Sequence, residues 1–167
     1  EVKTGYQWPV IVIERPDDAG EDYEHDLDAV DGAVREAFET YNVWRMYCDP
    51  HWIEALIDGW SNKYGERVVV HWYMNRPRPV AWAIRNWAQA IVTGEATNSG
   101  DDTFVRHVAN TRKRKLTVLD DNERQMHTIA KDAVGSPRKI DCAAAAVLSW
   151  EARGDCIKSG GVSFATE

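Results

Sequence analysis

The sequence has few cysteines and no long hydrophobic run. Three cysteines, Cys48, Cys142 and Cys156, stand among 167 residues, and none of them shows CxxC spacing. This odd number argues against a disulfide framework or a zinc site and fits buried or spare thiols in a reducing cytoplasm. No stretch of about 18 apolar residues is present, which excludes a helical membrane span. The first residues also lack the pattern of a secretory signal peptide.

Other absences bound the organisation of the chain. The sequence contains no GxxxxGK[ST] phosphate loop, no internal repeat and no linker long enough to divide it. A length of 167 residues suits one domain with a core of its own. Apolar residues make up 44% of the chain and eight residues are tryptophan, which predicts a compact fold rather than disorder.

Positive charge is scarce overall, and the net charge of −7 argues at first against a nucleic-acid partner. The charge is unevenly distributed, however. Residues 14–58 include 14 acidic and 3 basic side chains, whereas residues 76–115 include 8 basic and 3 acidic ones. Such asymmetry allows one half of a domain to present a phosphate-binding face. Ordinary solvated surface explains both halves equally well.

Periodicity in the first half predicts an α/β layer. We expect a buried strand over 6–16, a helix over 24–41, a short strand over 43–50, a helix over 51–65 and a β-branched strand over 67–73. This alternation of strands and helices predicts at least one parallel strand pair with right-handed connections.

The second half is predicted to be mainly helical. Helices are expected over 79–94 and over 101–115, where the second ends in a basic run. A hairpin is expected between 116 and 131, around the polar turn DDNER. The last helix is expected to start at Ser136–Pro137, a cap followed by proline, with one apolar stripe formed by Ile140, Ala144, Val147 and Leu148. Residues 1–154 are interpreted as one domain, and residues 155–167 as a tail.

Two aspartates stand at positions suited to chemistry. Asp49 ends a strand, and the carboxyl ends of strands are where open α/β sheets build their sites. Asp141 lies early in the last helix, beside its apolar stripe, where a carboxylate needs a compensating partner. Two such carboxylates can converge on Mg²⁺ or Mn²⁺, which prefer oxygen ligands. Neither aspartate is specific alone, because aspartate is common before proline and in early helical turns.

Basic residues form the candidate DNA contacts. The densest run is Arg112, Lys113, Arg114 and Lys115, and a second pair, Arg138 and Lys139, directly precedes Asp141. These cations can neutralise DNA phosphates, although a solvated helix end explains the run as well. His51 and His107 are interpreted as structural or surface residues. The tryptophans at 52, 60, 82 and 87 are interpreted as core.

Three stretches together resemble the C-terminal nuclease domain of phage terminase large subunits, of the type found in tailed phages of actinobacteria. They are NVWRMYCDPHWIEALIDGWSNKYG, NTRKRKLTVLDDNERQMHTIAKD and SPRKIDCAAAAVLSWEAR. The patterns DP-x-W after a strand and KIDxAxAAVLxxEAR at the end are the most specific parts. The resemblance runs from the strand near Tyr6 to Arg153.

The resemblance implies an RNase H-like α/β fold, with a central mixed β-sheet flanked by helices and an additional β-hairpin before the last helix. It implies a nuclease that cuts concatemeric double-stranded viral DNA with two Mg²⁺ or Mn²⁺ ions. Asp49 is similar to the acidic ligand after the fourth strand of that family, and Asp141 to the ligand in its last helix. Both are therefore expected to be catalytic and metal-binding. The implied partners are double-stranded DNA, the portal protein, the small terminase subunit and an N-terminal ATPase domain, in the host bacterial cytoplasm and without a membrane.

One departure from the family pattern concerns its first acidic ligand. That ligand lies upstream of the turn seen here as TGYQWPVIVIERP, so its strand is expected to precede Glu1, and neither Asp17 nor Asp18 is expected to replace it. The chain is therefore expected to lack one ligand and the ATPase motor, and to be inactive alone if that ligand is essential. Two alternatives stay open: a non-catalytic module that grips DNA and docks on the portal, or another RNase H-like nuclease or transposase.

Overall fold

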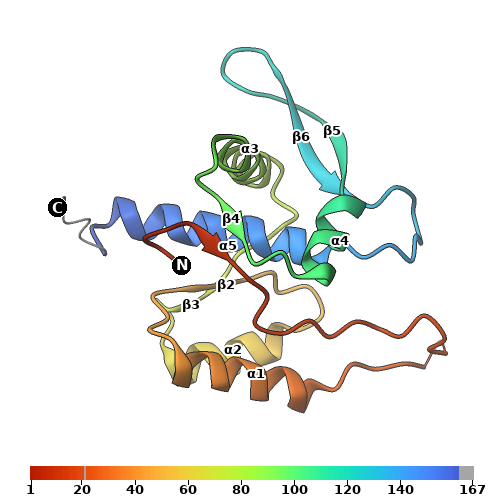
Figure 1. Ribbon diagram of the computed structural model, residues 1–167, viewed down its shortest axis with the longest axis vertical. Coiled ribbons are helices and arrows are strands. Elements are labelled where there is room, and N and C mark those ends of the chain that lie inside the picture. The colour runs from red at the N-terminus through yellow and green to blue at the C-terminus, as the bar shows by residue number, and fades with distance from the viewer. Residues whose placement is uncertain (21, 162–167) are drawn as a thin grey trace.

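A computed structural model describes residues 1–20 and 22–161 as a mixed α/β structure (Figure 1). Five helices and six short strands lie within these residues. In chain order they are β1 (Tyr6–Gln7), α1 (Leu27–Thr40), β2 (Met46–Cys48), α2 (Glu54–Tyr64), β3 (Val69–His71), α3 (Pro77–Thr93), β4 (Thr97–Asn98), α4 (Asp102–Asn110), β5 (Arg112–Leu119), β6 (Gln125–Ala130) and α5 (Asp141–Lys158).

β2 and β3 form a parallel pair, which confirms the prediction made from the strand–helix–strand pattern. Side chains along a strand point alternately to its two faces, and β2 follows this rule. Met46 and Cys48 pack against the hydrophobic cluster shared with α1 and α2, whereas Tyr47 packs against the cluster around α5. The strand pair therefore lies between two helical layers (Figure 1).

α1 and α2 cover the outer face of this strand pair. The centre of their cluster is Ile57 and Trp60, both buried. The rings of Phe38 and Tyr64 stack with their centroids 3.8 Å apart, and the indole N–H of Trp60 donates a hydrogen bond to Asp31 at 2.8 Å. These contacts join the two helices across the layer.

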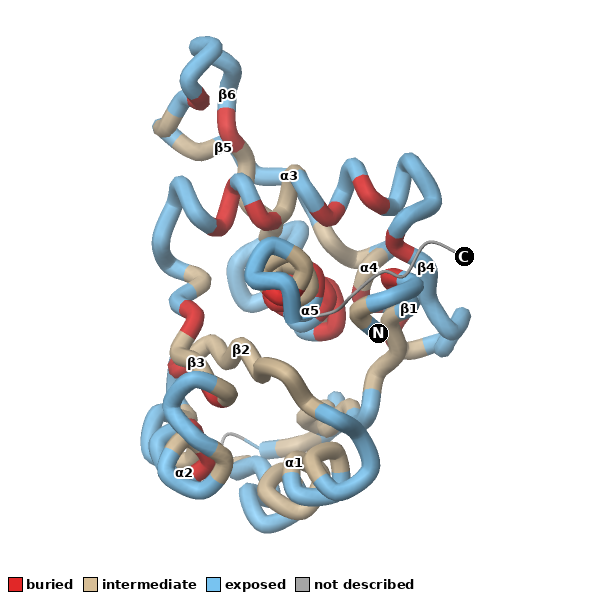
Figure 2. The backbone as a smooth tube through the Cα atoms, turned by 90° about the vertical axis from the view of Figure 1, so that its left-hand side faces the viewer, coloured by how far each residue is buried: buried red, intermediate tan, exposed pale blue. Residues whose placement is uncertain are grey.

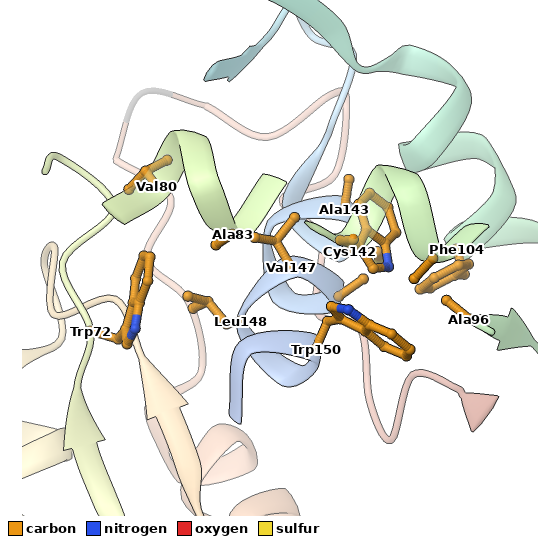
Figure 3. Packing of buried hydrophobic residues seen from close by; sticks show 13 residues of the cluster. Trp72, Val80, Ala83, Ala96, Phe104, Cys142, Ala143, Val147, Leu148 and Trp150 are labelled. Carbon is orange, nitrogen blue, oxygen red and sulfur yellow. The ribbon is translucent and has the colours of Figure 1, made fainter. Parts of the chain in front are cut away.

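α5 is the central helix of the molecule. Figure 2 shows it end-on, between α3 on one side and the β2–β3 pair on the other. A single apolar stripe was predicted, but the buried residues lie on more than one face, as is typical of a core helix. They are Cys142, Ala143, Ala146, Val147, Leu148, Trp150, Ala152 and Cys156. Figure 3 shows how Val147 and Leu148 pack toward Ala83 and Trp72.

The N-terminal segment is held against α5 and α3 by polar contacts. The Gln7 amide donates to the carbonyl of Ala146 at 2.8 Å and to the hydroxyl of Ser149 at 2.6 Å. Its oxygen accepts from the indole N–H of Trp87 at 2.9 Å. Gly5 has φ of +74°, and a Cβ there would lie 2.1 Å from the carbonyl oxygen of Glu95. Only glycine therefore permits this close approach beside the parallel β1–β4 pair.

β5 and β6 form an antiparallel hairpin that projects from the body of the molecule (Figure 1), so the predicted hairpin is confirmed. Asp120 organises its turn. The buried Asp120 carboxylate accepts from the backbone N–H groups of Asn122 and Arg124, at 2.9 and 2.8 Å, and from the Arg85 guanidinium of α3 at 2.9 Å. These hydrogen bonds lower the pKa of Asp120 from its usual value. The bond from the Arg124 N–H has the largest effect, followed by the bond from Arg85.

The expected single central sheet is wrong for the described residues, where the strands form three separate two-stranded pairs. The predicted strand over 6–16 shrinks to Tyr6–Gln7. Trp8 is followed by Pro9, which has no N–H to donate to a ladder, and β1 pairs only with the two residues of β4. The class is mixed α/β, with parallel and antiparallel pairs.

Two predicted helix boundaries are also wrong. The basic run 112–115 belongs to β5 instead of a helix end, because these residues pair across the hairpin with 127–130. The last helix begins at Asp141 instead of Ser136. The Ser136 hydroxyl accepts from the backbone N–H of Arg138 at 3.2 Å and so closes a local turn. The first turn of α5 is capped by His107 of α4.

The C-terminal half of α5 continues beyond residue 154, where a tail was expected. The Tyr47 hydroxyl donates to the Asp155 carboxylate at 2.7 Å, and Cys156 is fully buried. Residues 162–167 of the expected tail lie outside the described residues. All three cysteines are free, and burial raises the pKa of the Cys48 and Cys142 thiols to about 11. No helix within the described residues is both long and apolar enough to cross a membrane.

Enlarging an alanine on the buried face of α5 should destabilise the fold. Ala143 is completely buried, whereas Ala145 on the same helix is exposed. Ala143→Leu is expected to lower the free energy of unfolding by about 1–3 kcal/mol through overpacking. The matched control Ala145→Leu is expected to stay within about 0.5 kcal/mol of the original chain. Urea denaturation of both variants checks this, and equal effects would contradict the central placement of α5.

Candidate functional site

Asp49 lies directly after β2, at the carboxyl end predicted for it. Its carboxylate accepts a hydrogen bond from the backbone N–H of Met74 at 3.4 Å, and the side chain is half-buried. The backbone N–H of Trp72 donates to the carbonyl of Cys48 at 2.7 Å, so the ladder extends to the residue before Asp49. Because side chains alternate along β2, Asp49 follows Tyr47 onto the face that is turned to α5.

Asp141 is the first residue of α5 and is exposed. No side chain of its own neighbourhood caps this helix. Instead, Nδ1 of His107 in α4 accepts the backbone N–H of Cys142 at 3.1 Å, and His107 is completely buried. One of the unpaired N–H groups of the first turn is thereby satisfied from another helix. The position of Asp141 thus depends on a buried contact between α4 and α5.

The structure packs the strand that carries Asp49 against the helix that begins at Asp141. Tyr47 bonds Asp155 near the C-terminal end of α5. Trp72, whose backbone N–H donates to the carbonyl of Cys48, lies beside Leu148 near the middle of α5 (Figure 3). Successive residues of β2 therefore advance from the C-terminal end of α5 toward its N-terminal half.

The two candidate carboxylates are donors of a type that suits a hard divalent cation. Mg²⁺ is usually held by one or two carboxylates, with water and substrate phosphate completing its octahedral shell, and Asp49 and Asp141 are of this kind. Within residues 1–20 and 22–161, no cluster of three or more His, Cys, Asp or Glu side chains is placed to hold a metal ion. A site built on these two residues would need further oxygen ligands from water or phosphate.

Trp52 departs from its interpretation as a core residue. Its residue surface is 90% exposed, and its φ of +71° lies in the left-handed region that side chains other than glycine seldom adopt. The ring of His51 contacts it edge-on, with centroids 4.6 Å apart. The helix starts only at Glu54, so Trp52 falls in the turn after Asp-Pro, off the apolar face of α2. An exposed aromatic ring therefore stands three residues after Asp49. Trp82 also departs from its interpretation as core, since it is 38% exposed, whereas Trp60 and Trp87 are buried as predicted.

The basic run lies on the projecting hairpin. Residues 112–115 are all exposed, and alternation along β5 places two cations on each face of the ribbon. The guanidinium of Arg112 donates to the carbonyls of Ala109 and Thr111, at 2.8 and 3.1 Å. Desolvation lowers the pKa of His127 on β6, and Lys113 and Lys115 lower it further. The hairpin is thus a positively charged arm.

Arg138 and Lys139 lie in the loop before α5, apart from the residues of the hairpin in sequence. One Arg138 nitrogen pairs with the Asp132 carboxylate at 3.0 Å, and the Arg138 side chain is 55% exposed. The carbonyl of Lys139 accepts from the Asn110 amide of α4 at 3.0 Å. These contacts fix the backbone that leads into Asp141.

A network around Glu14 was not predicted from the sequence. The Glu14 carboxylate accepts from two nitrogens of Arg106, at 2.6 and 3.3 Å, and lies 2.9 Å from Nε2 of His107. Since Nδ1 of His107 accepts from a backbone N–H, Nε2 carries the proton and donates to Glu14. The hydrogen bond from Arg106 and, to a smaller extent, the one from His107 hold the pKa of Glu14 at about 2. The adjacent Arg106–His107 pair on an amphipathic helix was its only signal in the sequence.

Comparisons with known proteins point to phages. The Gene 13 protein of Mycobacterium phage D29 is 29% identical over 139 residues, and that of Mycobacterium phage L5 is 30% identical over the same length. Each match covers 78% of this chain but only 22% of the relative, so the chain spans about a fifth of the length of these curated relatives. No protein-family profile matches the chain, and no solved structure matches it.

Replacing the Glu14 carboxylate should reveal its contribution to stability through pH. A depressed folded pKa means that the contribution is present above about 4.5, the ordinary value, and is lost as pH falls toward about 2. Glu14→Gln is therefore expected to be less stable than the original chain at pH 7, and this difference should shrink steadily below pH 4.5. Urea denaturation across this range measures it.

The matched control for this experiment is Glu39→Gln, which removes an exposed carboxylate from α1. It reports the general effect of changing net charge by one unit. A stability difference between Glu14→Gln and the original chain that stays constant from pH 7 to pH 2 would contradict the ionised network.

Proposed function

We propose that this chain is the divalent-metal-dependent endonuclease part of a viral DNA-packaging terminase large subunit, which cleaves concatemeric double-stranded DNA. The observation that carries the proposal is the placement of two carboxylates. Asp49 directly follows a strand that packs on α5, and Asp141 is the first residue of that helix. This arrangement supports the proposal, in which Asp49 and Asp141 take the two ligand positions that the sequence resemblance implies.

We infer, as part of this proposal, an RNase H-like fold whose central sheet is divided, since the described strands form three separate pairs. Its support is a parallel strand pair, β2–β3, between helical layers, with the last helix packed across one face. The antiparallel hairpin before that helix fits the same arrangement. The phage origin of the two relatives is consistent with the proposal, and their names state no activity.

Asp49 and Asp141 are the residues that would hold Mg²⁺ or Mn²⁺ in this proposal. When bound, such an ion supplies Lewis-acid stabilisation of charge on the phosphate and activates water. The half-buried Asp49 is held by the Met74 N–H, which limits its rotation. Asp141 is fixed by the first turn of α5 and by the His107 contact to the next residue. The chain's own contribution is thus to place the two carboxylates at the end of β2 and at the start of α5, two elements that pack against each other.

The DNA is gripped, in this proposal, by the positively charged hairpin and by the cations before α5. The hairpin carries three exposed cations without a role in its own turn, Lys113, Arg114 and Lys115. Its turn end is tied to α3 by the Arg85–Asp120 pair and by Arg78, which donates to the carbonyl of Leu119 at 3.2 Å. A grip anchored in this way holds phosphates at a fixed place relative to the body.

The further partners in this proposal are those of a packaging motor in the host bacterial cytoplasm. They are the portal protein, the small terminase subunit and the ATPase domain of the same protein. The acidic region that contains α1 is the surface suited to contact basic partners, because it combines high negative charge with no buried residue on α1.

Removing either carboxylate should abolish cutting without unfolding the chain. Asp49→Asn and Asp141→Asn are each expected to reduce Mn²⁺-dependent nicking of supercoiled plasmid by about 100-fold or more, because each variant removes one ligand of the ion. The matched control, Asp28→Asn, removes an exposed carboxylate in the first turn of α1 and should retain full activity. Circular dichroism checks that each variant is folded.

Retained cutting in both site variants would remove these two residues from the mechanism. Crystals of the chain soaked in Mn²⁺ give an independent readout through anomalous diffraction. A peak between the two carboxylates is expected, and a peak bound elsewhere would contradict the assignment even if the chain cuts DNA.

The second candidate function is a non-catalytic module that grips DNA and docks on the portal. It is favoured by the exposed cations of the hairpin. Another RNase H-like enzyme, such as a transposase, would show strand transfer. DNA binding without metal-dependent cutting, and without Mn²⁺ at Asp49 and Asp141, would favour the gripping module.

The hairpin cations should set the salt dependence of DNA binding in either case. The triple variant Lys113→Gln, Arg114→Gln and Lys115→Gln keeps Arg112, whose guanidinium supports the local backbone. The slope of log affinity against log salt concentration is negative, and in this variant it should become shallower by about 0.9 for each phosphate that the hairpin no longer neutralises. The matched control replaces three exposed cations elsewhere, Lys3, Arg35 and Arg67, by Gln. Fluorescence anisotropy with a labelled duplex measures both slopes. Equal slopes would contradict phosphate binding by the hairpin cations.

A further inference from the structure

A cavity of about 490 Å³ opens beside the loop that leads into α5. Its walls come from three separate parts of the chain: residues 14–17 of the loop after β1, Arg106 and Asn110 of α4, and residues 137–139 before α5. Its volume falls within the range of natural ligand pockets, about 300–1,000 Å³. The cavity lies outside the hairpin and does not include Asp49 or Asp141 among its lining residues.

Four cations line this cavity, against two acidic residues, Glu14 and Asp17. The cations are Arg15, Arg106, Arg138 and Lys139. Glu14 is already engaged, because both of its oxygens accept hydrogen bonds from Arg106 and one of them also bonds His107. Its pKa of about 2 keeps it ionised at neutral pH, so it holds Arg106 in place as a fixed counter-charge.

Arg106 retains donors for a ligand. A guanidinium has five N–H donors, and the two bonds to Glu14 use one from each terminal nitrogen. The side chain is 49% exposed, so its remaining donors are accessible. The fork is therefore oriented by Glu14 and still open on another edge, which is the geometry suited to phosphate oxygens.

The opposite wall supplies further positive charge. Arg138 uses one terminal nitrogen for Asp132 and keeps its other donors. Lys139 forms no side-chain ion pair among the described residues, and its backbone is held by the Asn110 amide. Arg15 is less free, because it donates to the carbonyls of Ala19 and Gly20. Arg106, Arg138 and Lys139 are thus the three cations available to an anion.

We propose that this cavity binds a backbone phosphate of the DNA, through Arg106 on one wall and Arg138 and Lys139 on the other. The inference rests on the proposed function, since it takes DNA as the ligand. Lys139 is two residues before Asp141, so a phosphate in the cavity holds the strand next to the candidate metal carboxylate. The cavity then serves as a positioning site for a phosphate other than the one to be cut.

The test measures duplex binding by fluorescence anisotropy in EDTA, where no cutting occurs, at a series of salt concentrations. Arg138→Gln/Lys139→Gln is expected to lower the salt slope by about 0.9 for each phosphate that is no longer neutralised. Arg106→Gln should lower it similarly, by about 0.9. The controls are Arg35→Gln/Arg67→Gln and Arg67→Gln, which remove the same charges from exposed surface distant in sequence from the cavity.

The stability of each variant is measured by thermal unfolding, because Arg106→Gln also removes a partner of Glu14. Arg138 is exposed and outside the Glu14 network, so the double variant keeps the test decisive if Arg106→Gln unfolds. Salt slopes equal to those of the controls would overturn the cavity inference while leaving the proposed nuclease intact. Absence of any duplex binding by the original chain would overturn both. Reduced slopes in a chain that neither cuts DNA nor binds Mn²⁺ at Asp49 and Asp141 would support the cavity and overturn the nuclease.

Discussion

The burial of α5 on more than one face is the constraint on which the rest of the structure depends. A helix can be enclosed by α3, α4 and the β2–β3 pair only if its surface is narrow, and Ala143, Ala146 and Ala152 make it so. Larger residues such as Val147 and Trp150 then fill the spaces between its neighbours. The strands of the described residues form three separate pairs instead of a continuous sheet. The helix, instead of a sheet, therefore holds the layers together.

Charge is used in this protein mainly to fix positions. Glu14 orients Arg106 and His107, and His107 in turn holds the first turn of α5. Asp120 shapes the turn of the hairpin and ties it to Arg85 of α3. Both carboxylates have lowered pKa values because of these donors. Each network satisfies backbone N–H groups that a sequence pattern alone leaves unassigned.

The sequence predicted the elements that depend on local pattern. The parallel pair followed from β-branched runs around one helix, and the hairpin followed from two strands that flank DDNER. The errors arose where distant partners decide. Residues 112–115 form a strand because they pair with β6. The first turn of α5 is capped by His107, which lies 35 residues before Cys142 in the chain. The exposure of Trp52 depends on a left-handed turn that its tryptophan side chain gives no reason to expect. The assignment of Asp49 and Asp141 stays a prediction.

The alternation of side chains along β2 links the length of the preceding loop to the chemistry proposed for Asp49. Tyr47 faces α5, while Met46 and Cys48 face α1 and α2. A slip of one residue in this strand would exchange the two faces and turn the Asp49 carboxylate away from α5. Insertions or deletions of a single residue between α1 and β2 should therefore be far more harmful than substitutions there. Variation in this connection is expected to occur in side-chain identity while its length is kept.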